Sequence, residues 1–226
     1  AGLTTITGNT TYSAGINQGV KVNSGITLTN NAALGSASGS VTNAGTINSS
    51  ADNIKGTVSN TGSLNLSGGT LSKAVSGSGK TTITGNTTNS GGINQGVTVN
   101  SGVTLTNNAA LGSDSGTITN SGTINTSASN IKGAVTNNNT VNLSGGTLSK
   151  AISGSGTTNI TGIVSSNSAI SQAISIASAG DLTISASNVG GNVTNAGDLI
   201  LNGGTLSKAV TGSGKTSITG AVTANS

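Results

Sequence analysis

"GGTLSKAVSGSGKTTITG", residues 68–85, decides the fold, because nearly the same stretch occurs three times along the chain. The second occurrence is "GGTLSKAISGSGTTNITG" at 145–162, and the third is "GGTLSKAVTGSGKTSITG" at 203–220. The starting positions 68, 145 and 203 show that the step between copies falls from 77 to 58, so the third long repeat is shorter by 19. Internal repeats of this kind indicate a stacked, repetitive architecture.

A smaller period runs inside each long repeat. Val41, Val58 and Val75 recur with a step of 17, and they are preceded by a step of 19 from Val22 and followed by a step of 24 to Val99. The third repeat lacks the step of 19, while the neighbouring steps keep their lengths. A unit that can be removed whole predicts a structural rung, one full circuit of a coil.

Apolar residues within a rung keep an even spacing, as Val20, Val22 and Leu28 do, with Thr, Ser and Asn between them. This period of two is typical of strands with one buried face, and Gly and Asn clusters supply bends between the strands. We therefore predict an all-β, single-stranded parallel β-solenoid of about 11 rungs of 17–24 residues, right-handed by the general rule for parallel crossovers. We expect one domain over residues 1–226, with long repeats at about 3–79, 80–156 and 157–214 and the start of a further rung.

The composition excludes most chemistry. The 226 residues include no Cys, His, Arg or Glu, only 5% are charged, and the net charge is +4. We therefore expect no enzyme, and no catalytic, cofactor-binding or metal-binding residues. Without arginine or interleaved aromatic residues, nucleic-acid binding has no support either. No apolar run is long enough for a transmembrane segment.

One stretch resembles a phosphate-binding loop. "AVSGSGKT", residues 74–81, fits a loosened P-loop pattern, which recurs at 209–216. A P-loop requires a helix after the lysine, whereas "TTITG" follows here and predicts a strand. Thr157 stands at the lysine position of the middle repeat. We therefore interpret the stretch as a bend of the coil, and expect no nucleotide cofactor.

Positions 17 apart should stack on neighbouring rungs. Ser63 should lie over Lys80 and Thr140 over Thr157, and the third repeat should form one column of Asp181, Asp198 and Lys215. Two stacked carboxylates could attract a cation or act as an acid pair. We favour the interpretation that they are solvated and offset by the lysine. Lys73, Lys150 and Lys208 recur once per long repeat, which suits a solvated column that discourages lateral sheet pairing.

Asparagines recur at one bend of the rung. Asn43 and Asn60 are separated by a step of 17, as are Asn120 and Asn137. We predict that their side-chain amides bond to one another as a short ladder. The alternative is that they serve only as turn formers.

Residues 7–28, "TGNTTYSAGINQGVKVNSGITL", resemble the β-strand repeats of bacterial autotransporter and related adhesin passenger domains. The shared pattern is Thr-Gly-Asn, Thr-Tyr, a bend of small residues and Val-Asn-x-Gly-x-x-Leu, and "LSGGTL" at 66–71 and 143–148 is similar as well. The resemblance implies secretion, a right-handed β-helix, and adhesion or self-association in place of catalysis. The chain departs from the pattern at the tyrosine, since the position is occupied by Tyr12, Asn89 and Ser166 in the three repeats.

We expect a non-enzymatic structural or adhesive protein, secreted or held on the bacterial cell surface. Its partner would be a copy of itself, associated end to end or side by side as in a fibre or biofilm, or a glycan or host-surface receptor. A surface of Thr, Ser, Asn and Gly can meet such partners without large desolvation penalties for ions.

Two alternatives remain open. One is ice binding through files of outward Thr-x-Thr pairs, and the other is a polysaccharide-active enzyme that depends on Asp181 or Asp198, although it would lack arginines and aromatic platforms. The threonine pairs that fit the first alternative are Thr27 with Thr29, Thr82 with Thr84, Thr104 with Thr106, and Thr117 with Thr119.

Overall fold

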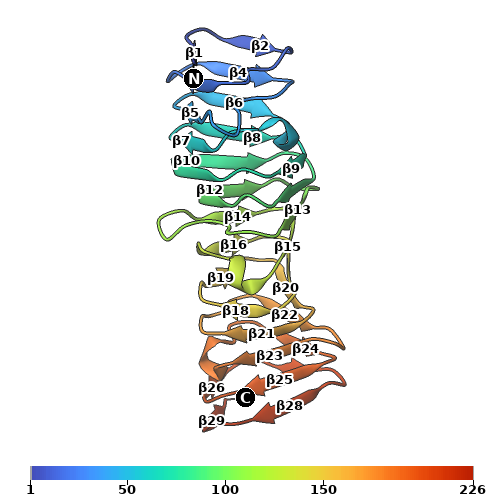
Figure 1. Cartoon of the computed structure of the whole chain (residues 1–226). Helices are drawn as coiled ribbons and strands as arrows, with labels where there is room; N and C mark the ends of the chain where they lie inside the picture. Colours follow the sequence, from blue (N-terminus) through green and yellow to red (C-terminus); the bar gives the residue numbers. More distant parts are fainter. Residues whose placement is uncertain (1, 226) are drawn as a thin grey trace.

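The computed structural model describes residues 2–225 and is a parallel β-solenoid of about 13 rungs. The strands stack as a single column, with the N-terminus near one end and the C-terminus near the other (Figure 1). All pairing between named strands is parallel, in sheets of 13, 9, 5 and 2 strands. The predicted fold class is therefore confirmed.

Each rung has three sides, and short strands follow one another around the coil. Side 1 carries β1 (Leu3–Ile6), β3 (Gly19–Val22), β5 (Val41–Asn43), β7 (Val58–Asn60), the start of β10 (Val75–Ile83) and of β12 (Ile93–Val99), then β18 (Gly146–Leu148), β21 (Ile163–Ser166), β23 (Asp181–Ile184), β25 (Asp198–Leu201) and β28 (Lys215–Ile218). Side 2 carries β2 (Thr10–Tyr12), β4 (Thr27–Asn30), β6 (Thr46–Ser49), β8 (Ser63–Leu66), the ends of β10 and β12, β14 (Ile118–Asn120), β16 (Val135–Asn137), β19 (Ile152–Ser153), β26 (Gly204–Leu206) and β29 (Val222–Ala224).

Side 3 is the most regular of the three. It carries β9 (Gly69–Leu71), β11 (Thr87–Asn89), β13 (Thr104–Asn107), β15 (Thr123–Thr126), β17 (Thr140–Leu143), β20 (Thr157–Ile160), β22 (Ala173–Ile176), β24 (Val193–Asn195) and β27 (Val210–Thr211). Three short 3-10 turns replace strands, one in each long repeat. They are η1 (Ala51–Asn53), η2 (Ala128–Asn130) and η3 (Ala186–Asn188).

The rungs are shorter and more numerous than the valine spacing predicts. Within β10 and β12, Val75 pairs with Ile93, whereas Val99 pairs with Ile83. The step from Val75 to Val99 therefore contains one rung and part of the next, so the predicted upper rung length of 24 is too long and the predicted count of about 11 is slightly too low. Val22 likewise pairs with Asn43, not with a valine. The valine series passes from side 1 to side 2 between Val75 and Val99, so its spacing could not show where each circuit closes.

Each full-length repeat makes four rungs and one side more. Pairing leads from Thr4 through Val20, Val41 and Val58 to Val75, which is four rungs on side 1. The repeat equivalent of Thr4 is Thr81, which lies further along β10 and pairs with Leu64 on side 2. Equivalent residues of successive repeats therefore lie on successive sides of the coil.

The third repeat has one rung fewer. In the second repeat, pairing leads from Val97 through Ile118 to Val135, which takes two rungs. In the third repeat, Ile174 pairs directly with Val193, which is one rung. The segment missing from the third repeat is therefore one circuit of the coil, and the sides before and after it keep their alignment.

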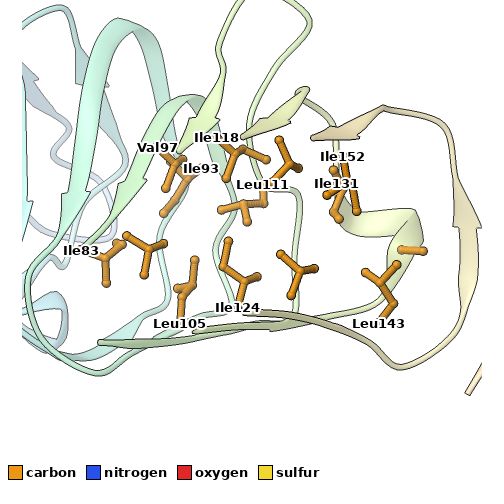
Figure 2. Packing of buried hydrophobic residues seen from close by; sticks show 14 of the residues in the cluster. Ile83, Ile93, Val97, Leu105, Leu111, Ile118, Ile124, Ile131, Leu143 and Ile152 are labelled. Atoms are coloured by element: carbon orange, nitrogen blue, oxygen red, sulfur yellow. The ribbon is translucent and has the colours of Figure 1, made fainter. Parts of the chain in front are cut away.

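Aliphatic side chains fill the interior of the coil as stacked columns. Val41, Val58 and Val75 are direct partners, as predicted, and each is at most 1% exposed. Figure 2 shows the middle of the molecule, where labelled side chains from different sides, such as Ile118, Leu111 and Ile124, point into the space that the rungs enclose. Because parallel stacking pairs the backbone of each rung with the next, a thin core is enough to support a polar chain.

The predicted asparagine ladder is present inside the coil. Asn43 Nδ2 donates to Asn60 Oδ1 at 2.7 Å, and Asn120 Nδ2 donates to Asn137 Oδ1 at 2.7 Å. All four side chains are 0% exposed, so their amides are structural partners and not surface turn formers.

A buried glutamine completes each ladder, a feature that the sequence did not reveal. In the amide orientation that satisfies its neighbours, Gln95 Oε1 accepts from Asn60 Nδ2 at 2.8 Å and from Thr81 Oγ1 at 2.7 Å. Gln172 does the same with Asn137 and Thr158, at 2.8 and 2.7 Å. The buried amides of the asparagines and glutamines thus find hydrogen-bond partners on neighbouring rungs.

Tyr12 interrupts a second inner ladder. In the second repeat Asn89 Nδ2 donates to Asn107 Oδ1 at 2.6 Å. In the first repeat Tyr12 pairs with Asn30 at the equivalent place, and Asn30 Oδ1 is buried without a hydrogen-bond partner. The tyrosine ring packs against the aliphatic core instead.

The first prediction concerns removal of one rung. Deleting residues 42–58 joins Val41 to Ser59 and places Asn60 over Val22, where Asn43 now lies. We expect the shortened chain to keep its β-type circular dichroism spectrum and cooperative unfolding, because rungs contribute as near-independent units. Deleting residues 42–50 ends inside a rung, and we expect that variant to lose both. If the two deletions behave alike, the rung is not the unit of the fold.

The second prediction concerns the inner ladder. Asn60→Ala removes the acceptor of Asn43 and the donor to Gln95, so buried polar groups lose their partners. We expect the free energy of unfolding to fall by about 2 kcal/mol in urea titrations. Asn65→Ala is the matched control, since Asn65 is half-buried on the outer surface, and about 0.5 kcal/mol is expected there. Equal losses would contradict the structural role of the inner amides.

Candidate functional site

The P-loop-like stretch is part of a strand. Residues Val75–Ile83 form β10, and the chain continues through Lys80 as strand. Thr81, which would face a nucleotide in a P-loop, is 0% exposed and hydrogen-bonded to Gln95. The strand predicted after Lys80 is confirmed, whereas the predicted bend is a register shift between Ser76 and Lys80 within one strand.

The glycines of this stretch are required by the stacking of the rungs. Gly77 has a φ of +122°, which residues with a side chain rarely adopt. A Cβ at Gly79 would meet the carbonyl oxygen of Gly62 on the rung below, and a Cβ at Gly62 would meet that of Gly45. The resemblance to a P-loop therefore comes from close packing of the backbone at a corner.

The charged columns lie partly where the sequence placed them. Ser63 pairs with Lys80 and Thr140 with Thr157, and Asp181, Asp198 and Lys215 are successive partners on side 1. Asp181 Oδ1 is enclosed without a hydrogen-bond partner. Within residues 2–225, no three His, Cys, Asp or Glu side chains gather as a metal-binding group would require.

The three recurring lysines do not form a column, contrary to the prediction. Lys73 follows β9 in the 9-stranded sheet, Lys150 follows β18 in the 5-stranded sheet, and Lys208 follows β26 in the 2-stranded sheet. Because each repeat advances by one side, these residues are on different sides of the coil.

Lys150 makes a contact that the sequence did not suggest. Its Nζ donates to Asp114 Oδ1 at 2.5 Å. Asp114 lies in an exposed loop in which Ser113 and Gly116 form an antiparallel bridge. Two effects hold the pKa of the Asp114 carboxyl below its ordinary value: the larger is this hydrogen bond, and the smaller is the positive charge of the lysine.

The threonine pairs are divided between sides. Thr27 and Thr29 lie on β4 of side 2, and Thr104 and Thr106 lie on β13 of side 3. The rung after β4 presents Asn48 as the partner of Thr29. A longer file of single hydroxyl-bearing residues does occur on side 2, where each residue is the direct partner of the next: Thr82, Thr98, Thr119, Thr136 and Ser153.

A polar groove of about 670 Å³ lies on side 3. We call it the second-repeat groove. It crosses β13, β15 and β17, with Asn125 and Asn142 on adjacent rungs and with Ser127 and Asn130 of the η2 region beside them. Its lining consists entirely of Thr, Asn and Ser residues.

The same groove occurs in the first repeat, with a volume of about 420 Å³. We call it the first-repeat groove. It crosses β4, β6 and β8 on side 2, where Asn48 and Asn65 are the repeat equivalents of Asn125 and Asn142. The one-side advance of each repeat therefore places the two grooves on neighbouring sides.

The outward asparagines beside these grooves form ladders of their own. Asn65 Nδ2 donates to Asn48 Oδ1 at 2.7 Å. In the second repeat, Asn142 Nδ2 donates to Asn125 Oδ1 at 2.7 Å, and Asn142 Oδ1 accepts from Asn159 Nδ2 at 2.8 Å. An amide has two N–H groups and two acceptor positions, so each ladder residue keeps hydrogen-bonding capacity for a ligand.

The third repeat lacks this arrangement. Thr183 and Ile200 are the equivalents of Asn125 and Asn142, and Ile200 pairs with Thr183 and Ser217 on side 1. Ile200 shows that the outer position tolerates an aliphatic side chain. The grooves were not predicted, because their asparagines have the pattern of ordinary outward strand residues. The signal that could have revealed them is their recurrence at the same parity with a step of 17.

No protein-family model, curated protein or solved structure matches the chain. In residues 2–225, the structure contains no helix with the length and apolar character needed to cross a membrane.

The third prediction tests the Asp114 ion pair. Lys150→Met removes both the hydrogen bond and the positive charge, so the pKa of Asp114 should rise to its ordinary range. Since the pair lowers the folded-state pKa, its small contribution to stability is present above the unfolded-state pKa and is lost as the pH falls through the folded-state pKa. NMR titration of the carboxyl carbon measures the change. Lys73→Met, at the equivalent lysine of the first repeat, is the control and should leave the Asp114 titration unchanged.

Proposed function

We propose that the protein is a non-enzymatic structural or adhesive rod of the cell exterior, which associates with copies of itself or with an external surface. The observation that carries the proposal is the outer surface of the coil, where uncharged hydroxyl and amide groups repeat from rung to rung. The file from Thr82 to Ser153 extends over five consecutive rungs without a charged side chain, although the Oγ1 of Thr98 within it is covered.

The chemistry of the surface supports contact over catalysis. The whole chain has eight lysines and four aspartates. Burying Thr, Ser and Asn against a partner that hydrogen-bonds costs far less than burying unpaired ions. The resemblance of residues 7–28 to adhesin passenger repeats favours the same function and a location outside the cell.

The regular spacing of the surface also suits a repetitive partner. Neighbouring strands in a sheet lie about 4.8 Å apart, so each outer file repeats its groups at that distance. A second coil has the same repeat, and a side-by-side contact made on one rung can recur on the next. Association can thus be weak per rung and still hold two rods together.

The fourth prediction tests this function. Sedimentation of the purified chain at rising concentration should show self-association, or the chain should adsorb to a hydrophilic surface, and neither should weaken as salt is raised, because screening acts on charges. Thr119→Glu places a charge in the side 2 file and should reduce association through that side, whereas Thr119→Ser keeps the hydroxyl and should not. A chain that stays monomeric and binds no surface would refute the proposal.

A further inference from the structure

We propose that the two grooves each bind a segment of a neutral, unbranched polysaccharide, and that one molecule thereby links two polysaccharide chains. This inference rests on the proposed adhesive function and names the ligand class. It starts from the second-repeat groove, which extends over four rungs from Thr106 through Asn125 and Asn142 to Thr161. Three rung spacings make it roughly 14 Å long, enough for a few sugar units.

The lining of the grooves determines the ligand class. Both grooves are lined only by Thr, Ser and Asn residues, so they offer donors and acceptors together but no charge. A charged ligand would lose its hydration without gaining a counter-ion. A sugar chain presents hydroxyl groups that donate and accept, and its C–H groups can contact the threonine methyls.

The ladders hold the groove amides in fixed positions. Asn142 is held between Asn125 and Asn159 by hydrogen bonds of 2.7 and 2.8 Å, which fix the direction of its amide. Among residues 2–225, no acceptor meets Asn125 Nδ2 at the first end of the ladder, so both of its N–H groups are available to a ligand. Fixed polar groups lose little conformational freedom on binding.

An extended peptide is the main competing ligand, and the strand pairing disfavours it. A peptide strand binds by adding to the free edge of a sheet. The strand β15 on the groove floor is already paired with β13 on one side and β17 on the other. The groove crosses these strands from rung to rung, so it offers side chains and not an open backbone edge.

Because the two grooves lie on different sides of the coil, one molecule can link two polysaccharide chains. The first-repeat groove lies on side 2 and the second-repeat groove on side 3, separated by the four rungs and one side of a repeat. The separation along the axis is about 20 Å. Two grooves that open in different directions cannot lie against one straight chain, but each can hold a chain of its own. Because no aromatic residue lines either groove for stacking, we expect millimolar affinity per groove, raised in the assembly by multivalency.

The experiment uses neutral hexasaccharides of β-1,4-linked glucose and of β-1,4-linked N-acetylglucosamine, with an oligogalacturonate as the charged control. NMR of the full chain follows the side-chain amides of Asn48, Asn65, Asn125 and Asn142. At millimolar concentrations at least one neutral sugar should shift both pairs, and the oligogalacturonate should shift neither. Absence of any shift with both neutral sugars would overturn the proposal.

The groove variants place isoleucine at the positions where the third repeat has Ile200. Asn142→Ile should abolish the shifts in the second-repeat groove only, and Asn65→Ile those in the first-repeat groove only, each lowering the affinity of its groove at least tenfold. Ile200 at the equivalent place indicates that the substitution is compatible with the fold, and thermal unfolding checks this. Thr42 is exposed on β5 of side 1, outside both grooves and outside the side 2 file, so Thr42→Ile is the matched control and should keep both sites. Binding that survives the double variant Asn65→Ile/Asn142→Ile would overturn the proposal.

Linking has its own readout. The wild-type chain and Thr42→Ile should raise the viscosity of a hydroxyethylcellulose solution. Each single groove variant should still bind but raise the viscosity no more than the double variant does. Equal viscosity for the wild type and the single groove variants would refute linking.

If a peptide library binds the grooves and sugars do not, the ligand class is wrong. If sugars fail while the chain still associates or adsorbs, the proposed adhesive function stands and this inference falls.

Discussion

Parallel pairing of each rung with the next is the constraint on which the whole structure depends. It satisfies the backbone of a chain whose buried hydrophobic side chains, within residues 2–225, are Val, Ile, Leu and Ala. It also favours columns of like inward residues, although Val22 lies next to Asn43, because a buried polar group must find its partner in its own bend or on a neighbouring rung. Val41, Val58 and Val75 form such a column with methyl groups, and Asn43 and Asn60 form one with amides.

The same constraint decides how the sequence can vary. At the inner corners a residue is free to change only together with its neighbours above and below, as Tyr12 demonstrates by leaving Asn30 Oδ1 without a donor. On the outer surface the restriction is weaker, and Ile200 stands in line with Thr183 and Ser217. The outer files are therefore where different repeats can acquire different binding properties without loss of the coil.

The sequence was sufficient for the fold class, the stacking of positions 17 apart and the inner asparagine ladder, because each depends on a short, regular period. It was insufficient for the closure of the rung. The strand β10 continues around a corner from Val75 to Ile83, and no turn residue other than its glycines marks the change of side. The glutamine contacts and the grooves escaped prediction for a related reason: Gln95 in β12 reaches back to Asn60 in β7, and each groove gathers residues from several rungs.

The one-side advance of each repeat also sets what a longer or shorter chain of this type would display. Removal of whole rungs, as in the third repeat, changes the position of a surface feature along the coil axis but not the direction in which it faces. Addition of a complete long repeat turns the next copy of every outer feature to the next side, so that three copies face all the way around the axis. Features copied in this manner follow a screw path, and a flat object that touches the coil meets only every third copy.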